Sequence, residues 1–136
     1  MTVKALREKW ITFCKTFAGA YEDYPFRDEN WTMMRAANKK TFAAIYERGG
    51  LLCINVKCEP MQADFWREVY PAVIPGYHMN KVHWNTILLD GSIEDAAVEE
   101  MIAHSYGLVQ PKRPENRKKA GKTVDITGKG CYNNKS

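Results

Sequence analysis

The segment Lys81–Asn85 is the most informative pattern for chemistry in this 136-residue sequence. Alternate side chains of an extended strand share a face, so Lys81, His83 and Asn85 would point to one side of a sheet. Cations neutralise phosphates, and Asn and Lys can donate hydrogen bonds to base edges. The pattern therefore predicts a polar, cationic patch on an open sheet face, unless Trp84 fills the core and the polar residues merely hold the preceding loop. Two lysines would join the patch if their strands are adjacent: Lys40 and Lys57.

Positive charge is concentrated in residues 110–136, which carry eight Lys and Arg against two Asp and Glu, a net charge of +6. Residues 1–109 hold 12 basic and 14 acidic residues, a net charge of −2. The run Arg117-Lys118-Lys119 could supply phosphate contacts without reading sequence. The alternative is a solubilising tail with no partner. Pro and Gly recur here, so we expect a basic, mostly flexible tail with one short strand-like piece at most.

Other chemistry has little support in the sequence. His78 and His83 show no zinc-like spacing with Cys53 or Cys58, so no metal or other cofactor is expected. The cysteines form no Cys-x-x-Cys pair, and we expect reduced thiols that fill the core. No Gly-rich phosphate loop or paired carboxylates suggest catalysis, so no catalytic residue is assigned. An enzyme or small-molecule site remains a third interpretation, which would need a pocket joining the two histidines with Tyr106.

Hydrophobic periodicity predicts the elements that position these residues. A first helix carries an apolar face at Leu6, Trp10, Phe13, Cys14 and Phe17, with Thr2 as N-cap and an end at Gly19. Strands are predicted over residues 31–36, 42–48, 51–57, 77–82 and 84–89, with Gly49-Gly50 as a hairpin turn. In the strand over 51–57, Leu52, Ile54 and Val56 alternate with Cys53, Asn55 and Lys57, which predicts one packed face and one wet face. A second helix begins at Pro60 and buries Met61, Phe65 and Val69. A last helix has Ser92 and Asp95 as a capping box and ends at Gly107. Its predicted buried stripe consists of Ile93, Ala97, Val98, Met101, Ile102 and Ser105.

The predicted fold class is α+β, with two layers: an antiparallel sheet with helices on one face, in the order α-β-β-β-α-β-β-α. One domain is expected over residues 1–109, followed by the tail. No apolar run approaches the roughly 20 residues that cross a bilayer, and charged residues interrupt the N-terminal apolar runs. A cytoplasmic protein without a membrane partner is therefore expected.

The segment Tyr77–Thr86 resembles the MmcQ/YjbR family, a DUF419-type, double-wing-like family of DNA-binding proteins. Other matching marks are Tyr24-Pro25-Phe26, Lys40, Phe42-Ala43, Lys57, Trp84, Asp90-Gly91, Ser105-Tyr106 and Leu108-Val109. The resemblance covers about residues 1–109 and implies the same sheet-and-helix order. It also implies DNA binding, by analogy of fold alone.

The leading hypothesis is DNA binding through the open sheet face and the basic tail. The alternative is a protein-interaction module, similar to secretion chaperones, which would bind a protein partner or form a homodimer. Two further groups of residues could have either a binding role or a packing role. Ser105 and Tyr106 could contact a ligand, although a packing role is favoured. The aromatic residues Tyr21, Tyr24, Phe26 and Trp31 could stack on bases, although such residues more often cover a sheet edge and core.

Overall fold

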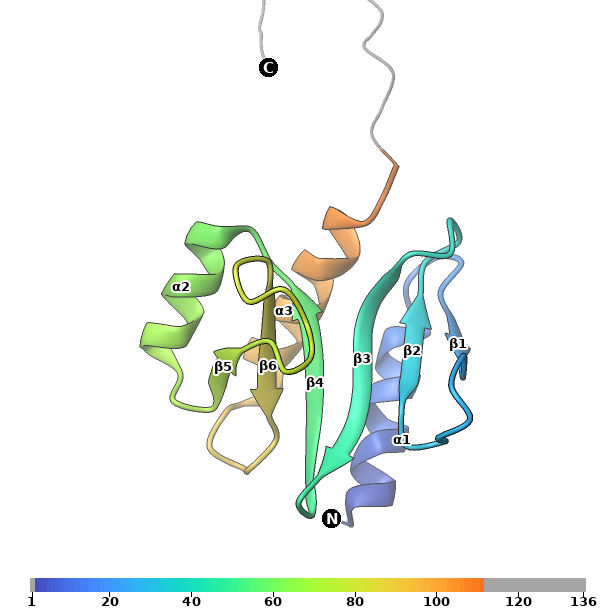
Figure 1. The fold of residues 1–136 in the computed structure, drawn as a ribbon, viewed down its shortest axis with the longest axis horizontal. Coiled ribbons are helices and arrows are strands. Elements are labelled where there is room, and N and C mark those ends of the chain that lie inside the picture. Colours follow the sequence, from blue (N-terminus) through green and yellow to red (C-terminus); the bar gives the residue numbers. More distant parts are fainter. Residues whose placement is uncertain (1, 112–136) are drawn as a thin grey trace, which may run out of the picture.

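The computed structural model describes residues 2–111, which form three helices and one six-stranded antiparallel sheet (Figure 1). The elements are α1 (Val3–Cys14), β1 (Tyr21–Asp23), β2 (Thr32–Arg35), β3 (Thr41–Arg48), β4 (Leu51–Lys57), α2 (Pro60–Val69), β5 (Val73–Pro75), β6 (Trp84–Leu88) and α3 (Asp95–Leu108). The strand order is β1-β2-β3-β4-β6-β5. The predicted α+β class and element order are confirmed, with the short strand β1 added. None of these helices combines the length and apolarity needed to cross a membrane.

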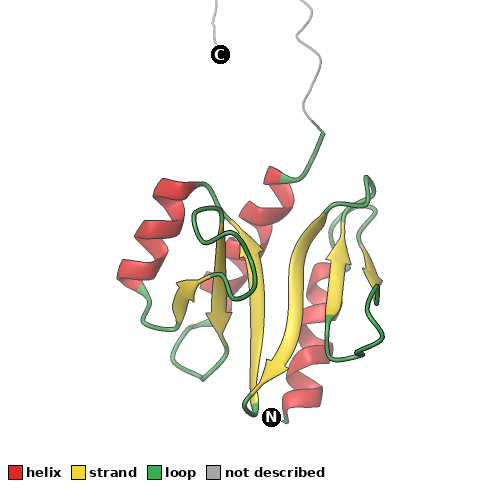
Figure 2. Cartoon of the chain, in the orientation of Figure 1, coloured by secondary structure: helices red, strands yellow, loops and turns green. Residues whose placement is uncertain are grey.

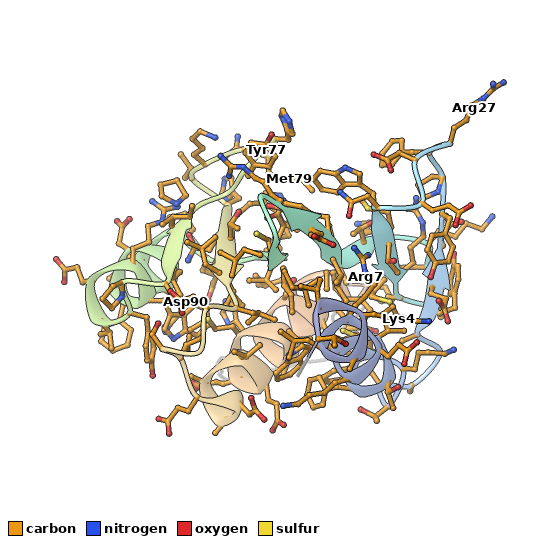
Figure 3. All side chains as sticks on the ribbon, turned by 90° about the horizontal axis from the view of Figure 1, so that it is seen from below. Lys4, Arg7, Arg27, Tyr77, Met79 and Asp90 are labelled. Carbon is orange, nitrogen blue, oxygen red and sulfur yellow. The ribbon has the colours of Figure 1, made fainter. Side chains whose placement is uncertain are left out.

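The helices share one face of the sheet, as predicted. Figure 3 shows α1 and α3 together on one side of the sheet, and Figure 2 shows α2 beside the β5–β6 edge. Thr2 is the N-cap of α1, since its hydroxyl accepts the N–H of Ala5 at 3.0 Å. Between helices and sheet lies a core that includes Trp10, Ile54 and Met101, all at most 1% exposed. Burying such large apolar side chains is the main stabilising contribution to the fold.

The predicted alternation in β4 is half right. Leu52, Ile54 and Val56 are buried in the core, as expected. Cys53 and Asn55 point to the opposite face, which we expected to be wet, yet both are buried as well. Something must therefore cover the sheet on the side without helices.

Ser105 of α3 has a structural role at the end of the central ladder. The pairing of β2 with β3 shifts register between Met34 and Arg35, and the β3–β4 ladder begins only at Ala43. The Ser105 hydroxyl donates to the carbonyl of Phe42 at 2.6 Å and accepts the N–H of Lys57 at 2.9 Å. Two buried backbone groups that the ladder leaves free are thus satisfied by one side chain.

The predicted buried face of α2 is wrong. Met61, Phe65 and Val69 are 87%, 54% and 48% exposed, whereas Ala63 and Trp66 are buried. Both sets have helical spacing, so periodicity alone could not choose between them. Packing decides: the Trp66 ring lies edge-on to His104 of α3, with centroids 5.2 Å apart. We call Met61, Phe65 and Val69 the apolar stripe of α2.

We expect Phe65→Ser to change the free energy of unfolding by no more than about 0.5 kcal/mol, the usual range for exposed sites. The phenyl ring is mainly in water already, so its removal creates no cavity. Urea denaturation of the full-length protein measures the change. A loss above about 2 kcal/mol would be typical of a core position and would contradict the packing described for α2.

Other element boundaries also differ from prediction. Helix α3 begins at Asp95, because the N–H and hydroxyl of Ser92 both bond to Asp90 Oδ1 in a local turn. Gly107 lies inside the helix rather than after it. The strand between α2 and β6 is β5 (Val73–Pro75), and residues 76–83 form a loop in place of the predicted strand over 77–82.

Candidate functional site

The sheet face opposite α1 and α3 is covered by Trp31 and by the loop 76–83. Figure 3 shows Tyr77 and Met79 across the sheet from the two helices. The Trp31 ring stacks on Tyr46 of β3, with centroids 4.0 Å apart and planes 17° apart. Tyr77 stacks on the same ring at 5.9 Å. The open, wet face expected from the sequence is therefore an aromatic layer.

A buried hydrogen-bond network fastens the loop to the sheet. Asn55 Oδ1 accepts from the hydroxyls of Tyr46 at 2.8 Å and Thr86 at 2.6 Å. Asn55 Nδ2 donates to the carbonyl of Tyr77 at 2.8 Å, and the Tyr77 N–H donates to Thr86 Oγ1 at 2.9 Å. Burial raises the pKa of Tyr46 to about 12, so its phenol remains a donor at neutral pH. Both backbone polar groups of Tyr77, its carbonyl and its N–H, are thus hydrogen-bonded to side chains of the sheet, which holds the loop in place.

Between this loop and residues 26–33 lies a hollow of about 500 Å³, which we call the aromatic cleft. Its lining consists of Phe26, Asp28, Trp31, Met33, His78 and Met79. The side chain of Phe26 is 54% exposed. His78 has φ of 60°, in the left-handed region that non-glycine residues rarely adopt. Such local strain is concentrated at functional sites, and the cleft suits a flat, largely apolar group.

The predicted cations lie at one end of the sheet rather than on one face. Lys40 is in the β2–β3 turn and Lys57 ends β4. Lys81 and His83 belong to the loop 76–83, where the carbonyl of His83 accepts the N–H of Cys58 at 2.7 Å. We call these four residues the cationic end. Within residues 2–111, none of them forms an ion pair with a carboxylate.

Asn85 does not belong to this group, contrary to prediction. It is buried, accepting from Arg67 Nε at 2.6 Å and donating to the carbonyl of Ala63 at 3.2 Å. Residues 81–83 form a turn, so strand alternation does not extend from Lys81 to Asn85. The expected core position of Trp84 is also only partly right, since this residue pairs with Lys57 and is half-buried.

The other residues of the resemblance are mainly structural. The Tyr24 hydroxyl donates to Glu22, and its neighbour Pro25 is exposed. The Tyr106 hydroxyl donates to the carbonyl of Ala18 at 2.6 Å, and its ring stacks on Phe17 at 4.7 Å. Tyr106 therefore lies on the helix side of the sheet, whereas His78 lies beside Trp31 and Tyr77 on the other side. The favoured packing role of Ser105 and Tyr106 is confirmed, whereas the core role favoured for Phe26 is wrong.

The basic segment starts beside the cationic end. Asn38, in the same turn as Lys40, donates from Nδ2 to the carbonyl of Val109 at 2.8 Å. Figure 1 shows the chain leaving α3 at the end of the molecule that holds this turn. Arg117, Lys118 and Lys119, and the expectation of a flexible tail, lie outside the described residues.

The described cysteines are buried, and residues 2–111 contain no cluster of candidate metal ligands. Cys14, Cys53 and Cys58 are free and buried. Burial raises the pKa of Cys14 and Cys58 to about 12, which suppresses the nucleophilic thiolate. The described residues contain no group of three or more His, Cys, Asp or Glu placed to hold a metal ion.

Comparison with known proteins identifies the family. The family model described as YjbR matches residues 15–108. The chain belongs to the YjbR family. The uncharacterised YjbR protein of Escherichia coli (strain K12) is 32% identical over 119 residues, covering 88% of this chain and 96% of that protein. Uncharacterised YyaQ of Bacillus subtilis (strain 168) is 28% identical, covering 76% of this chain and 98% of its own. The resemblance noted in the sequence is thus confirmed.

Solved structures from two other bacteria share the fold. A Pseudomonas syringae protein superposes with a TM-score of 0.69 at 25% identity, covering 76% of this chain and 98% of its own. Protein DR2400 of Deinococcus radiodurans, which carries a DUF419 domain, gives a TM-score of 0.67 at 28% identity, covering 79% of this chain and 78% of its own.

Several residues of the site were not predicted from the sequence. The Arg48 guanidinium lies 3.9 Å from the Tyr77 ring centroid. Arg48 precedes a hairpin glycine, and no sequence motif marked it as a site residue. Arg67 bonds Asn85 and the carbonyl of Lys81, joining α2 to the loop. Asp28, Met33 and Met79 come from separate segments, and only the tertiary fold places them around one cleft.

Proposed function

We propose that this YjbR-family protein binds nucleic acid, using the cationic end and the basic C-terminal segment together. The observation that carries the proposal is the Asn38–Val109 hydrogen bond. It fixes the start of a segment with a net charge of +6 beside lysines that have no carboxylate partner within residues 2–111. Free cations gathered at one place attract a polyanion by releasing its condensed counterions.

The distribution of acidic residues favours the same end. Glu94, Asp95, Glu99 and Glu100 are in or next to the first turns of α3, and Figure 1 shows that α3 starts at the end of the molecule opposite the β2–β3 turn. A near-neutral body can therefore still present a positive end. This uneven field would orient a nucleic acid toward the loop 76–83 and away from the start of α3.

The double variant Lys40→Ala/Lys57→Ala should bind single-stranded DNA about tenfold more weakly at low salt, with a log–log salt slope shallower by about 1.5. The matched control is Lys4→Ala/Lys9→Ala on α1, which removes the same charge elsewhere and should have little effect. Fluorescence anisotropy at several salt concentrations measures both. Equal losses in the two variants would show that only net charge matters, and the proposed location would be wrong.

A second candidate function, protein interaction, is favoured by the apolar stripe of α2. Exposed apolar residues in helical register are typical of helix-in-groove contacts, and Asp64 and Glu68 flank this stripe. Self-association is the simplest form of this candidate. Sedimentation would then give a dimer for the natural chain and a monomer for Phe65→Asp. A monomer in both cases would oppose it.

A further inference from the structure

We infer that the aromatic cleft holds one unpaired nucleobase, and that Asp28 makes it prefer a base with an exocyclic amino group, guanine above all. The inference rests on the proposed function and deepens it. It assigns to the protein a single-strand binding site with a base preference, in addition to the phosphate contacts of the cationic end.

The lining fits a flat aromatic ring. Trp31 has one ring face against Tyr46, and it contributes to the cleft together with the exposed ring of Phe26 and the imidazole of His78. Ring planes of this kind stack on bases in single-strand-binding proteins, where each stacked base contributes substantially to affinity. The thioethers of Met33 and Met79 add polarisable, adaptable contact surface. A volume of about 500 Å³ lies within the range typical of small-ligand sites.

Each loop beside the cleft also brings a cation that a backbone phosphate would need. Arg27 follows Phe26 in the chain, and Figure 3 shows its side chain projecting into solvent on the side of Tyr77 and Met79. Lys81 is in the same loop as Met79, and its Nζ donates to the carbonyl of Gly76 at 2.8 Å. Apolar lining with cations at the rim suits a base attached to a charged backbone better than it suits a neutral lipid or an organic cation.

Asp28 is the one carboxylate in the cleft lining. Its Oδ1 accepts the N–H of Asn30 at 2.9 Å, a turn contact that restricts the carboxylate. An ionised carboxylate only accepts hydrogen bonds. Guanine presents two adjacent donors, N1–H and the N2 amino group, which match the two oxygens of a carboxylate. Thymine and uracil present one N–H between two carbonyls, which the carboxylate would repel.

The cleft exists before any ligand binds. Asn55 and Thr86 hold the backbone of Tyr77, and Asn80 Oδ1 accepts the N–H groups of Val82 and His83. A loop fixed in this way loses little conformational entropy on binding. The strained backbone of His78 is maintained by the same contacts.

The test compares a short labelled oligothymidylate with the same oligomer carrying one central guanine, by fluorescence anisotropy with the full-length protein. The natural chain should bind the guanine oligomer about tenfold more tightly, the discrimination expected of a two-donor contact. Asp28→Asn keeps an acceptor for Asn30 but should lose the guanine preference. Glu29→Gln removes a neighbouring charge outside the cleft and should retain it. Phe26→Ala, at an exposed ring, should weaken binding of both oligomers by removing a stacking surface.

The outcomes separate this inference from the proposed function. If oligothymidylate binds with the expected salt dependence but guanine brings no gain, or Asp28→Asn keeps the gain, the base site is overturned and phosphate binding stands. If neither oligomer binds at low salt, both are overturned.

Discussion

Replacing Asn55 by alanine is expected to lower the free energy of unfolding by about 3 kcal/mol and to release the loop 76–83 from the sheet. The amide of Asn55 satisfies the hydroxyls of Tyr46 and Thr86 and the carbonyl of Tyr77. Without it, three polar groups at or near the buried sheet surface lose a partner. Each such group costs about 1–3 kcal/mol when left unsatisfied, although relaxation and entering water recover part of the sum.

Urea denaturation and amide hydrogen exchange measure this effect. Tyr46→Phe is the matched control, because it removes only one hydroxyl from the network and should cost about 1 kcal/mol. In Asn55→Ala we expect faster exchange for Tyr77, whose N–H bonds Thr86. If Asn55→Ala is no less stable than Tyr46→Phe, and exchange in the loop is unchanged, then the network does not hold the cleft together.

Neutralising the basic segment should have the largest effect on binding. In the full-length chain, the eight Lys and Arg of residues 110–136 are replaced by glutamine. Loss of several phosphate contacts should weaken single-stranded DNA binding by about a hundredfold at low salt and flatten the salt slope by several units. The base preference should survive, since the cleft keeps all its lining residues.

Anisotropy titrations over a range of salt concentrations measure both quantities. A variant with both acidic residues of the segment, Glu115 and Asp125, replaced by glutamine is the control and should bind slightly more tightly. An unchanged salt slope in the neutralised protein would mean that the segment makes no phosphate contacts, and the nucleic-acid proposal would lose its main source of affinity.

The sequence predicted the features that depend on local periodicity. The alternation of Leu52, Ile54 and Val56 and the stripe from Ile93 to Ser105 both mark surfaces buried against the core. These patterns are reliable because strand and helix periods fix which side chains share a face. Together with turn residues such as Gly49 and Gly50, which adopt positive φ, they determined the sheet-and-helix order.

The site itself could not be predicted in the same way. Helix α2 has two sets of apolar residues with helical spacing. Only the contacts of this helix with β6 and α3 determine that Trp66 is the residue buried. Asn85 changes face because the turn before it breaks the alternation. The opposite sheet face was expected to be wet because Asn55 is polar, but a satisfied polar network can be buried beneath a loop. These outcomes depend on tertiary packing.

The most direct test of the central claim is a two-dimensional ¹⁵N–¹H NMR titration of the full-length protein with a short single-stranded oligonucleotide. If nucleic acid binds where we propose, amide shifts should change at the cationic end, notably at Lys40 and Lys57, and in the loop 76–83. Resonances of α2 should remain in place. Shift changes confined to the apolar stripe of α2, or none at low salt, would contradict that claim.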